Sequence, residues 1–144
     1  MADALPTQLH LEIVTPDHQV ARESVSGVSI PGKNGDLGIL PGHAPLLSEL
    51  QVGELSYVHE GLTHHLAVSW GFAEVLPDRV IILAETAERA EEIDVERAEQ
   101  ARQRAEERLK KLTDPEIDME RARAALDRAL TRLQVSRHAK QELA

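Results

Sequence analysis

Glycine is absent from every position after Ala84, and alanine, glutamate and arginine dominate the rest of the chain. Before that point, short apolar stretches alternate with turn-forming pairs such as Pro77-Asp78. Glycine and proline interrupt helices, whereas alanine, glutamate and arginine favour them. The sequence therefore predicts two units of different class, a strand-rich unit at residues 1–87 and a helical unit at residues 88–144.

The first unit is predicted to consist of short strands. Leu9–Val14 alternates apolar and polar side chains, which is the pattern of a strand with one buried face. Such strands recur at short spacing with turn residues between them, which is typical of a β-sandwich or barrel. Further strands are expected within residues 20–30, 55–59, 62–68, 72–76 and 79–83, with hairpin turns at Glu60-Gly61 and Pro77-Asp78.

The second unit carries two apolar stripes with helical spacing, because apolar residues recur at steps of three and four in each of two stretches. Thr113-Asp114-Pro115 separates the stretches. So short a break makes the helices antiparallel neighbours, each on the order of 25 to 30 Å long at about 1.5 Å per residue. The stripe residues are Val95, Ala98, Ala101, Ala105, Leu109 and Leu112 in the first helix, and Met119, Ala122, Leu126, Ala129, Leu130 and Leu133 in the second.

These stripes are narrow and rich in alanine, so the hairpin buries little apolar area at roughly 25 cal/mol per Å². We expect a marginally stable hairpin whose helices can separate while each stays helical, as a conformational switch requires. On composition alone, a solvated appendage without a switching role is equally consistent with the pattern.

Composition excludes several classes of function. The formal net charge is -9 and the aromatic residues are Tyr57, Trp70 and Phe72, so the chain lacks the basic surface and the stacking rings that nucleic acid requires. Cysteine is absent, which rules out disulfides and thiolate metal sites. No segment approaches the roughly 18 consecutive apolar residues of a membrane span. Neither nucleic acid nor the membrane interior is an expected partner.

The run Gly35–Leu47 combines residues that restrict the backbone with residues that anchor it. Its three glycines reach torsion angles closed to other residues, Pro41 and Pro45 each fix one torsion, and its aliphatic side chains can pack on a core. The run is predicted to be a rigid loop that presents a shape to a partner. A phosphate-binding loop is excluded, because Lys33 precedes the glycines and the prolines prevent the helix that would have to follow.

From residue 35 this run reads Gly-Asp-Leu-Gly-Ile-Leu-Pro-Gly-His-Ala-Pro, and it resembles the hallmark loop of the epsilon subunit of bacterial and plastid F-type ATP synthases. The resemblance extends over nearly the whole chain, through its length, its order of strands before helices and the opening residues of both helices. It implies a non-catalytic central-stalk subunit with an N-terminal ten-stranded β-sandwich and a C-terminal antiparallel two-helix hairpin. Trp70 departs from the family, which commonly has a small residue before the Gly-Phe of this strand.

The resemblance also implies partners. The sandwich would bind the gamma subunit and the ring of membrane-embedded c subunits, and would thereby couple proton-driven rotation to ATP synthesis in the catalytic head. The protein would associate with a membrane only through these partners, on the cytoplasmic face of a bacterial inner membrane. The lack of a transit peptide favours this location over an organelle, although a plastid-encoded copy would look the same. The expected ring contacts are Asp36, Leu37, Gly38, Ile39, Pro41, Gly42 and His43.

Both predicted helices open with the signature Ile-Asp-x-Glu-Arg-Ala, at residues 93–98 and 117–122. Asp94 and Asp118 are suited to cap the exposed amides of the first helical turns, and capping alone is sufficient to explain the repeat. The resemblance adds a second interpretation, because ATP-binding bacterial epsilon subunits carry Ile/Leu-Asp-x-x-Arg-Ala at the first position. It implies an ATP site in which arginines bind phosphate oxygens and carboxylates bind adenine or ribose. Its residues would be Glu88, Asp94, Arg97, Arg128 and Arg132, with ATP as a regulatory ligand and no required cofactor.

Arg121, Arg128 and Arg132 form a basic stripe on the second helix, which is unusual in an acidic chain. By resemblance, the hairpin can extend and lay this stripe against an acidic segment of the catalytic beta subunits, which blocks ATP hydrolysis by the alpha/beta head. Charged faces of surface helices are usually only solvated, and that interpretation stays open for these arginines.

Neither a catalytic group nor a metal site is expected. His59, His64 and His65 are close in sequence, but a two-residue hairpin turn sets Tyr57 rather than His59 opposite His64, and adjacent residues of a strand point to opposite faces. No nucleophile motif is legible, which disfavours a small hydrolase. The main rival to the family resemblance is a free-standing adaptor whose β-domain binds a partner protein and whose helical hairpin mediates oligomerisation.

Overall fold

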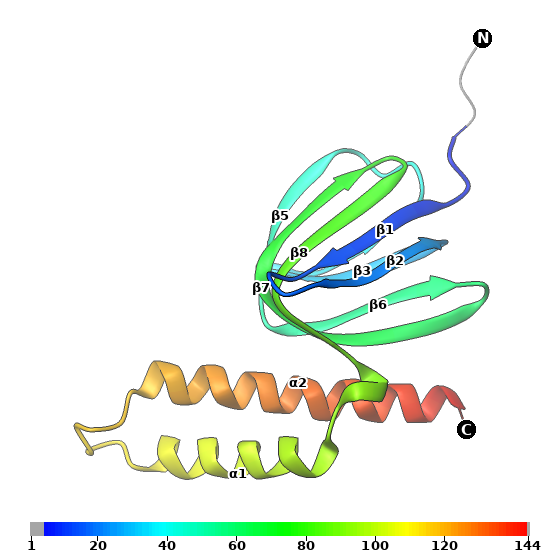
Figure 1. Cartoon of the computed structure of the whole chain (residues 1–144). Helices are drawn as coiled ribbons and strands as arrows, with labels where there is room; N and C mark the ends of the chain where they lie inside the picture. The colour runs from blue at the N-terminus through cyan, green and yellow to red at the C-terminus, as the bar shows by residue number, and fades with distance from the viewer. Residues whose placement is uncertain (1–4, 144) are drawn as a thin grey trace.

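The chain folds into a β-sandwich with a helical hairpin lying along one side of it (Figure 1). This computed structural model describes residues 5–143. The elements are β1 (Leu9–Val14), β2 (Gln19–Val25), β3 (Gly27–Gly32), β4 (Gly35–Ile39), β5 (Leu46–Leu50), β6 (Gly53–His59), β7 (Leu62–Leu76), β8 (Arg79–Arg89), the 3₁₀ turn η1 (Ala90–Glu92), α1 (Val95–Lys110) and α2 (Met119–Leu143). The predicted order, a strand-rich unit followed by two helices, is confirmed.

The strands follow the order β2-β1-β8-β7-β5-β3-β4, and β6 pairs with both β3 and β7. β1 and β8 are parallel, and the other pairs are antiparallel. The alternation in β1 buries Leu9, Leu11 and Ile13 completely, as one buried strand face predicts. Tyr57 is the one aromatic side chain among the core residues, so aliphatic packing holds this sandwich together.

In the described residues 5–143, the sandwich has eight strands rather than the expected ten. Residues 62–68 and 72–76, expected to be separate strands, belong to the single strand β7, which pairs first with β6 and then with β5. Trp70 lies at this change of partner with a φ of 43°, and Gly71 follows with a φ of 136°. A Cβ on Gly71 would lie 1.9 Å from the Leu83 carbonyl oxygen. The glycine therefore allows β8 to approach closely and does not end the strand.

Two other segments differ from expectation. Residues 20–30 hold the end of β2 and the start of β3 rather than one strand. The predicted loop Gly35–Leu47 begins with β4, which pairs antiparallel with β3, so that residues 40–45 alone lie outside strands. Ile39 at the end of β4 is fully buried, and this burial outweighs the low strand propensity of the glycines in β4.

α1 and α2 are antiparallel neighbours, as the short break between them predicts (Figure 1). α1 has 16 residues and α2 has 25, which correspond to about 24 Å and 37 Å. α2 is thus longer than expected, because neither glycine nor proline follows Pro115 to end it.

Small side chains fill the space between the two helices. Leu112 and Leu130 were expected in the apolar stripes and are not buried: Leu112 lies beyond the end of α1 and is 79% exposed, and Leu130 is 45% exposed. The buried hairpin alanines are Ala98, Ala105, Ala122 and Ala129.

α2 contacts the sandwich, and α1 lies on its far side (Figure 1). Val135 of α2 is fully buried and packs with Ala67 of β7 and Ile93. Because α2 is confined between α1 and the sheet, side chains from three parts of the chain meet along its length. These are the residues of the candidate site.

Candidate functional site

The repeated signature caps both helices. The Asp94 carboxylate accepts a hydrogen bond of 3.1 Å from the Arg97 backbone amide, and the Asp118 carboxylate accepts one of 3.1 Å from the Arg121 amide. Each carboxylate also lies at the positive end of a helix, where its charge is favourable. The capping interpretation is confirmed for both aspartates.

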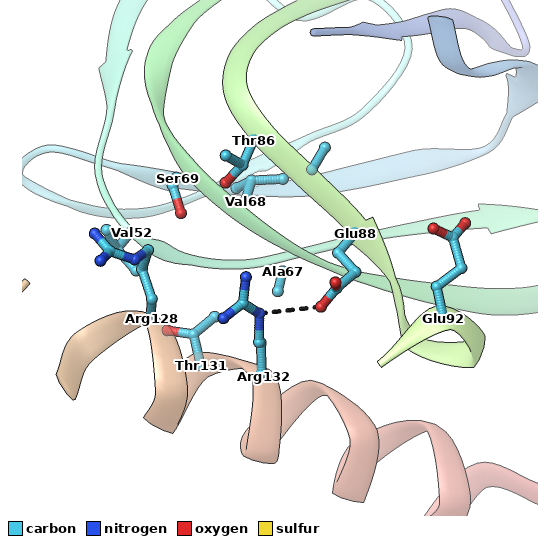
Figure 2. Close-up of a pocket in the computed structure, with 11 residues that line it drawn as sticks. Val52, Ala67, Val68, Ser69, Thr86, Glu88, Glu92, Arg128, Thr131 and Arg132 are labelled. Carbon is cyan, nitrogen blue, oxygen red and sulfur yellow. Dashed lines mark hydrogen bonds and ion pairs between the residues drawn. The ribbon is translucent and has the colours of Figure 1, made fainter. Parts of the chain in front are cut away.

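A pocket of about 250 Å³ lies between the sandwich and α2 (Figure 2). Figure 2 shows Arg128, Thr131 and Arg132 rising from α2 toward the middle of β7 and the C-terminal part of β8. Arg132 Nε donates a hydrogen bond of 3.1 Å to the Glu88 carboxylate. Ser69 and Thr86 line the side of the pocket that the sheet forms, and each contributes a hydroxyl. Hydroxyls, two carboxylates and two guanidinium groups therefore line a single cavity.

A second pocket of about 330 Å³ lies between the start of α1 and the same stretch of α2. It shares three residues with the first pocket, namely Glu88, Glu92 and Arg132. Its other polar wall residues, Asp94, Arg97 and Arg104, come from the beginning and the third turn of α1. The Glu88–Arg132 ion pair thus stands between two adjacent pockets.

All five residues of the predicted ATP site line one or both of these pockets. Arg128 lines the first, Asp94 and Arg97 line the second, and Glu88 and Arg132 line both. Guanidinium groups bind phosphate oxygens through paired donors, so the arrangement is chemically suited to a polyphosphate. The Asp94 carboxylate already accepts the capping hydrogen bond. A ligand can therefore donate only to the remaining lone pairs of its two oxygens.

Sequence reasoning missed several polar residues that line the two pockets, among them Arg104, Thr131 and Glu92. Arg104 follows Arg97 by seven residues, or about two helical turns, and this spacing could have placed it on the same face. Thr131 and Glu92 carry no comparable signal. Trp70 lies beneath Arg128, whose guanidinium carbon is 5.6 Å from the ring centroid, so the departure from the family pattern is a cation–π contact here.

The predicted ring-contact segment lies at β4 and the turn that follows it. Asp36, Gly38 and Gly42 are exposed, Leu37 and Pro41 are half-buried, and His43 donates its backbone amide to the Leu40 carbonyl. Ile39 is completely buried, so it anchors the segment and has no free surface. Leu40 and Leu47, which are 66% and 71% exposed, add apolar surface that the prediction did not include.

The three arginines of the predicted basic stripe do not share one free surface. Arg121 is exposed near the start of α2, whereas Arg128 and Arg132 are half-buried against the sandwich. Arg128 makes a cation–π contact with Trp70, and Arg132 forms an ion pair with Glu88. In this conformation, the stripe is therefore divided.

The histidines are arranged as the hairpin register predicts. Tyr57 pairs with His64, their rings stack with centroids 4.9 Å apart, and His59 pairs with Leu62. His59 Nδ1 donates to the Ser24 carbonyl at 2.7 Å, and this hydrogen bond raises the pKa of His59 above 6.5. His65 faces the other way, toward α2. Among residues 5–143, no serine or threonine hydroxyl is hydrogen-bonded to a histidine ring.

Two family models match the chain. The model described as "ATP synthase, Delta/Epsilon chain, beta-sandwich domain" matches residues 8–90, and "ATP synthase, Delta/Epsilon chain, long alpha-helix domain" matches residues 91–137. The two matched ranges meet within η1, one residue after the end of β8.

Several curated proteins are similar over most of their length. An ATP synthase epsilon chain from Geotalea daltonii is 50% identical over 129 residues, which cover 90% of this chain and 94% of that one. The epsilon chain from Geotalea uraniireducens is 47% identical over 94% of this chain and 98% of its own. The one from Koribacter versatilis is 64% identical over 98 residues, or 68% of this chain and 69% of that one.

Solved structures share the fold. A chain in the Euglena gracilis mitochondrial ATP synthase, from a structure of its OSCP/F1/c-ring, aligns with a TM-score of 0.72 at 24% identity and covers 100% of this chain and 86% of its own. A chain of the Tetrahymena thermophila mitochondrial enzyme, from its central stalk and c-ring, aligns with a TM-score of 0.58 at 15% identity, over 94% of this chain and 98% of that one. Within residues 5–143, no helix is long and apolar enough to cross a bilayer.

Proposed function

The chain belongs to the ATP synthase epsilon chain family, and we propose that it acts there as a non-catalytic rotor subunit whose helical hairpin is a nucleotide-sensitive brake. The family membership carries the first half of this proposal. The second half depends on the pockets between α2, α1 and the sandwich. The rival adaptor function is not favoured, because family models match both the sandwich and the helices.

The sandwich is proposed to bind the gamma subunit and the c-ring, and so to transmit rotation. Support comes from the exposed segment around Asp36 and Gly42, where two hydrogen bonds restrict the backbone. Gly42 donates its amide to the Pro77 carbonyl at 2.7 Å, and His43 donates to Leu40 at 3.1 Å. A restrained, exposed segment loses little conformational entropy on binding. Through such partners the protein would lie peripherally on the cytoplasmic face of a bacterial inner membrane.

ATP is proposed to bind in the two adjacent pockets and to hold the hairpin against the sandwich. The observation that carries this idea is that Arg128 and Arg132 lie on α2 while their contacts, Trp70 and Glu88, lie on the sandwich. A polyphosphate between these elements would be bound by the docked hairpin alone. Such a ligand stabilises the docked state by about 2.7 kcal/mol at a hundredfold excess over Kd.

The inhibitory state is proposed to arise when the nucleotide is absent. Undocking would free Arg128 and Arg132 from the sandwich and add them to the exposed Arg121. The reunited stripe would then be available to an acidic segment of the alpha/beta catalytic head. Since the same arginines serve both states, ATP binding and inhibition exclude each other, which is the condition for a ligand-controlled equilibrium.

The test is calorimetric titration of ATP into the full chain and into Arg128→Ala. Loss of one guanidinium–phosphate contact is expected to weaken binding by about tenfold or more. Arg137→Ala is the matched control, because Arg137 is exposed on the same helix and lines neither pocket. Equal affinity in both variants would remove Arg128 from the site. If the unaltered chain binds no ATP at millimolar concentration, the hairpin does not sense this nucleotide.

A further inference from the structure

We infer that Glu54, His65 and His138 form a binding site for a divalent transition-metal ion such as Zn²⁺, at the place where the end of α2 meets the sandwich. One donor atom from each of these residues lies within 4.8 Å of the other two. The site is separate from the pockets discussed above, because none of the three residues lines either of them.

Strand register places two of the donors on one face of the sheet. Glu54 of β6 pairs with Ala67 of β7, and His65 lies two positions before Ala67 on the same side of the strand. Val135 of α2 packs on Ala67, and His138 comes one helical turn later. The packing that docks α2 therefore also delivers the third donor.

The distances describe a compact donor set. His138 Nδ1 lies 2.9 Å and 3.0 Å from the two oxygens of the Glu54 carboxylate. His65 Nδ1 lies 3.7 Å from the nearer of these oxygens. Donors of a tetrahedral zinc site with bonds of about 2.0–2.1 Å are roughly 3.4 Å apart, so small side-chain adjustments suffice to admit an ion.

His65 provides independent support for a ligand. Its side chain is 8% exposed, yet neither ring nitrogen makes a hydrogen bond of acceptable geometry. A buried polar group without a partner is costly, and in native structures it calls for a specific explanation. A metal ion on Nδ1 supplies the missing partner for one nitrogen.

The second nitrogen of His65 would then have a role as well. Nε2 lies 3.0 Å from the Glu142 carboxylate, but no hydrogen bond joins the two groups in the present geometry. With Nδ1 on a metal, Nε2 carries the proton and a small rotation lets it donate to Glu142. A carboxylate behind a metal-bound histidine orients the ring and strengthens its donor nitrogen.

The chemistry of the donors selects the kind of ion. Two imidazoles and one carboxylate suit Zn²⁺ and neighbouring transition metals, whereas Mg²⁺ and Ca²⁺ prefer oxygen ligands throughout. His138 is 42% exposed at its side chain, so water can complete the coordination. Because the ligands come from both β strands and α2, a bound ion would tie the helical hairpin to the sandwich.

The experiment is calorimetric titration of ZnCl₂ into the full chain after treatment with a chelator and removal of that chelator, with no nucleotide present. The expected result is one Zn²⁺ per chain, with affinity reduced about tenfold or more in His138→Ala and in Glu54→Gln. His43→Ala is the control, since His43 lies in the turn after β4 and is not one of the three donors, and this variant should bind like the unaltered chain. Circular dichroism checks that each variant keeps its helix content.

Co²⁺ provides a second readout, because its visible absorption reports the ligand set. Absorption typical of nitrogen and oxygen ligands should appear in the unaltered chain and disappear in His138→Ala. The inference is overturned if the unaltered chain binds neither ion, or if His138→Ala and Glu54→Gln bind as tightly as His43→Ala. In either event, the cluster is only a polar contact between the helix and the sheet. ATP binding can succeed or fail independently of this result.

Discussion

Replacing Val135 with alanine should weaken the docking of α2 on the sandwich more than replacing Arg132 does. Val135 is fully buried against Ala67 and Ile93. Its truncation removes two methyl groups at about 0.8 kcal/mol each and leaves a small cavity, for a total cost of about 2 kcal/mol. The Arg132–Glu88 pair joins side chains that are 37% and 34% exposed, so its loss should cost less than about 1 kcal/mol.

Trp70 provides the assay. It is the single tryptophan, it is 38% exposed, and Arg128 of α2 lies over its ring. Undocking of α2 should shift its emission to longer wavelength, and a urea titration followed by this emission yields the free energy of undocking. At about 1.4 kcal/mol per factor of ten, Val135→Ala should change the undocking constant by about thirtyfold.

Two results would refute this reasoning. The first is a larger loss of docking free energy in Arg132→Ala than in Val135→Ala, which would mean that the ion pair and not the apolar contact holds the helix. The second is an emission change that coincides at every urea concentration with the loss of strand signal in circular dichroism. That outcome would mean that the hairpin and the sandwich unfold as one unit.

Three further predictions concern individual positions. Gly71→Ala should destabilise the sandwich by several kcal/mol in thermal unfolding, because its Cβ would lie 1.9 Å from the Leu83 carbonyl oxygen; roughly unchanged stability would contradict the close approach of β7 and β8. Asp118→Ala should cost about 1 kcal/mol through loss of the α2 cap, measured as lower helix content on heating, whereas Asp118→Asn should retain most of it. The hydrogen bond to the Ser24 carbonyl raises the pKa of His59, so the stabilisation that His59 contributes is complete below pH 6.5 and is lost as the pH rises through the higher folded value. An NMR titration of His59 with a midpoint at or below 6.5 would be inconsistent with that sign.

Local signals predicted much of the fold because their physical causes act within a few residues. The residue types at Glu60-Gly61 predict the turn, and its two-residue length predicts that Tyr57 pairs with His64. The capping role of Asp118 was likewise evident, since a carboxylate reaches the amides of the next turn in any helix that begins there.

The errors have an equally definite cause. The apolar pattern predicts separate strands at residues 62–68 and 72–76, which leaves Gly71 between them. In the structure, the neighbouring backbone of β8 requires glycine there, and only the pairing of β7 with three other strands reveals this requirement. Leu130 fits the helical spacing of the apolar stripe, but α1 does not cover it and it remains 45% exposed.

The sequence by itself determined the order of a strand-rich and a helical unit, the turns, the caps and, through a family resemblance, the residues to examine for a nucleotide. The tertiary structure alone decided which residues meet. Glu88 and Arg132 are separated by 44 positions, and Glu54 and His138 by 84, yet both pairs are in contact. Spacing rules extend over one or two turns of a helix or across one hairpin. Contacts over longer separations depend on how the buried face of α2 fits the sheet, and that fit is a property of the packed molecule.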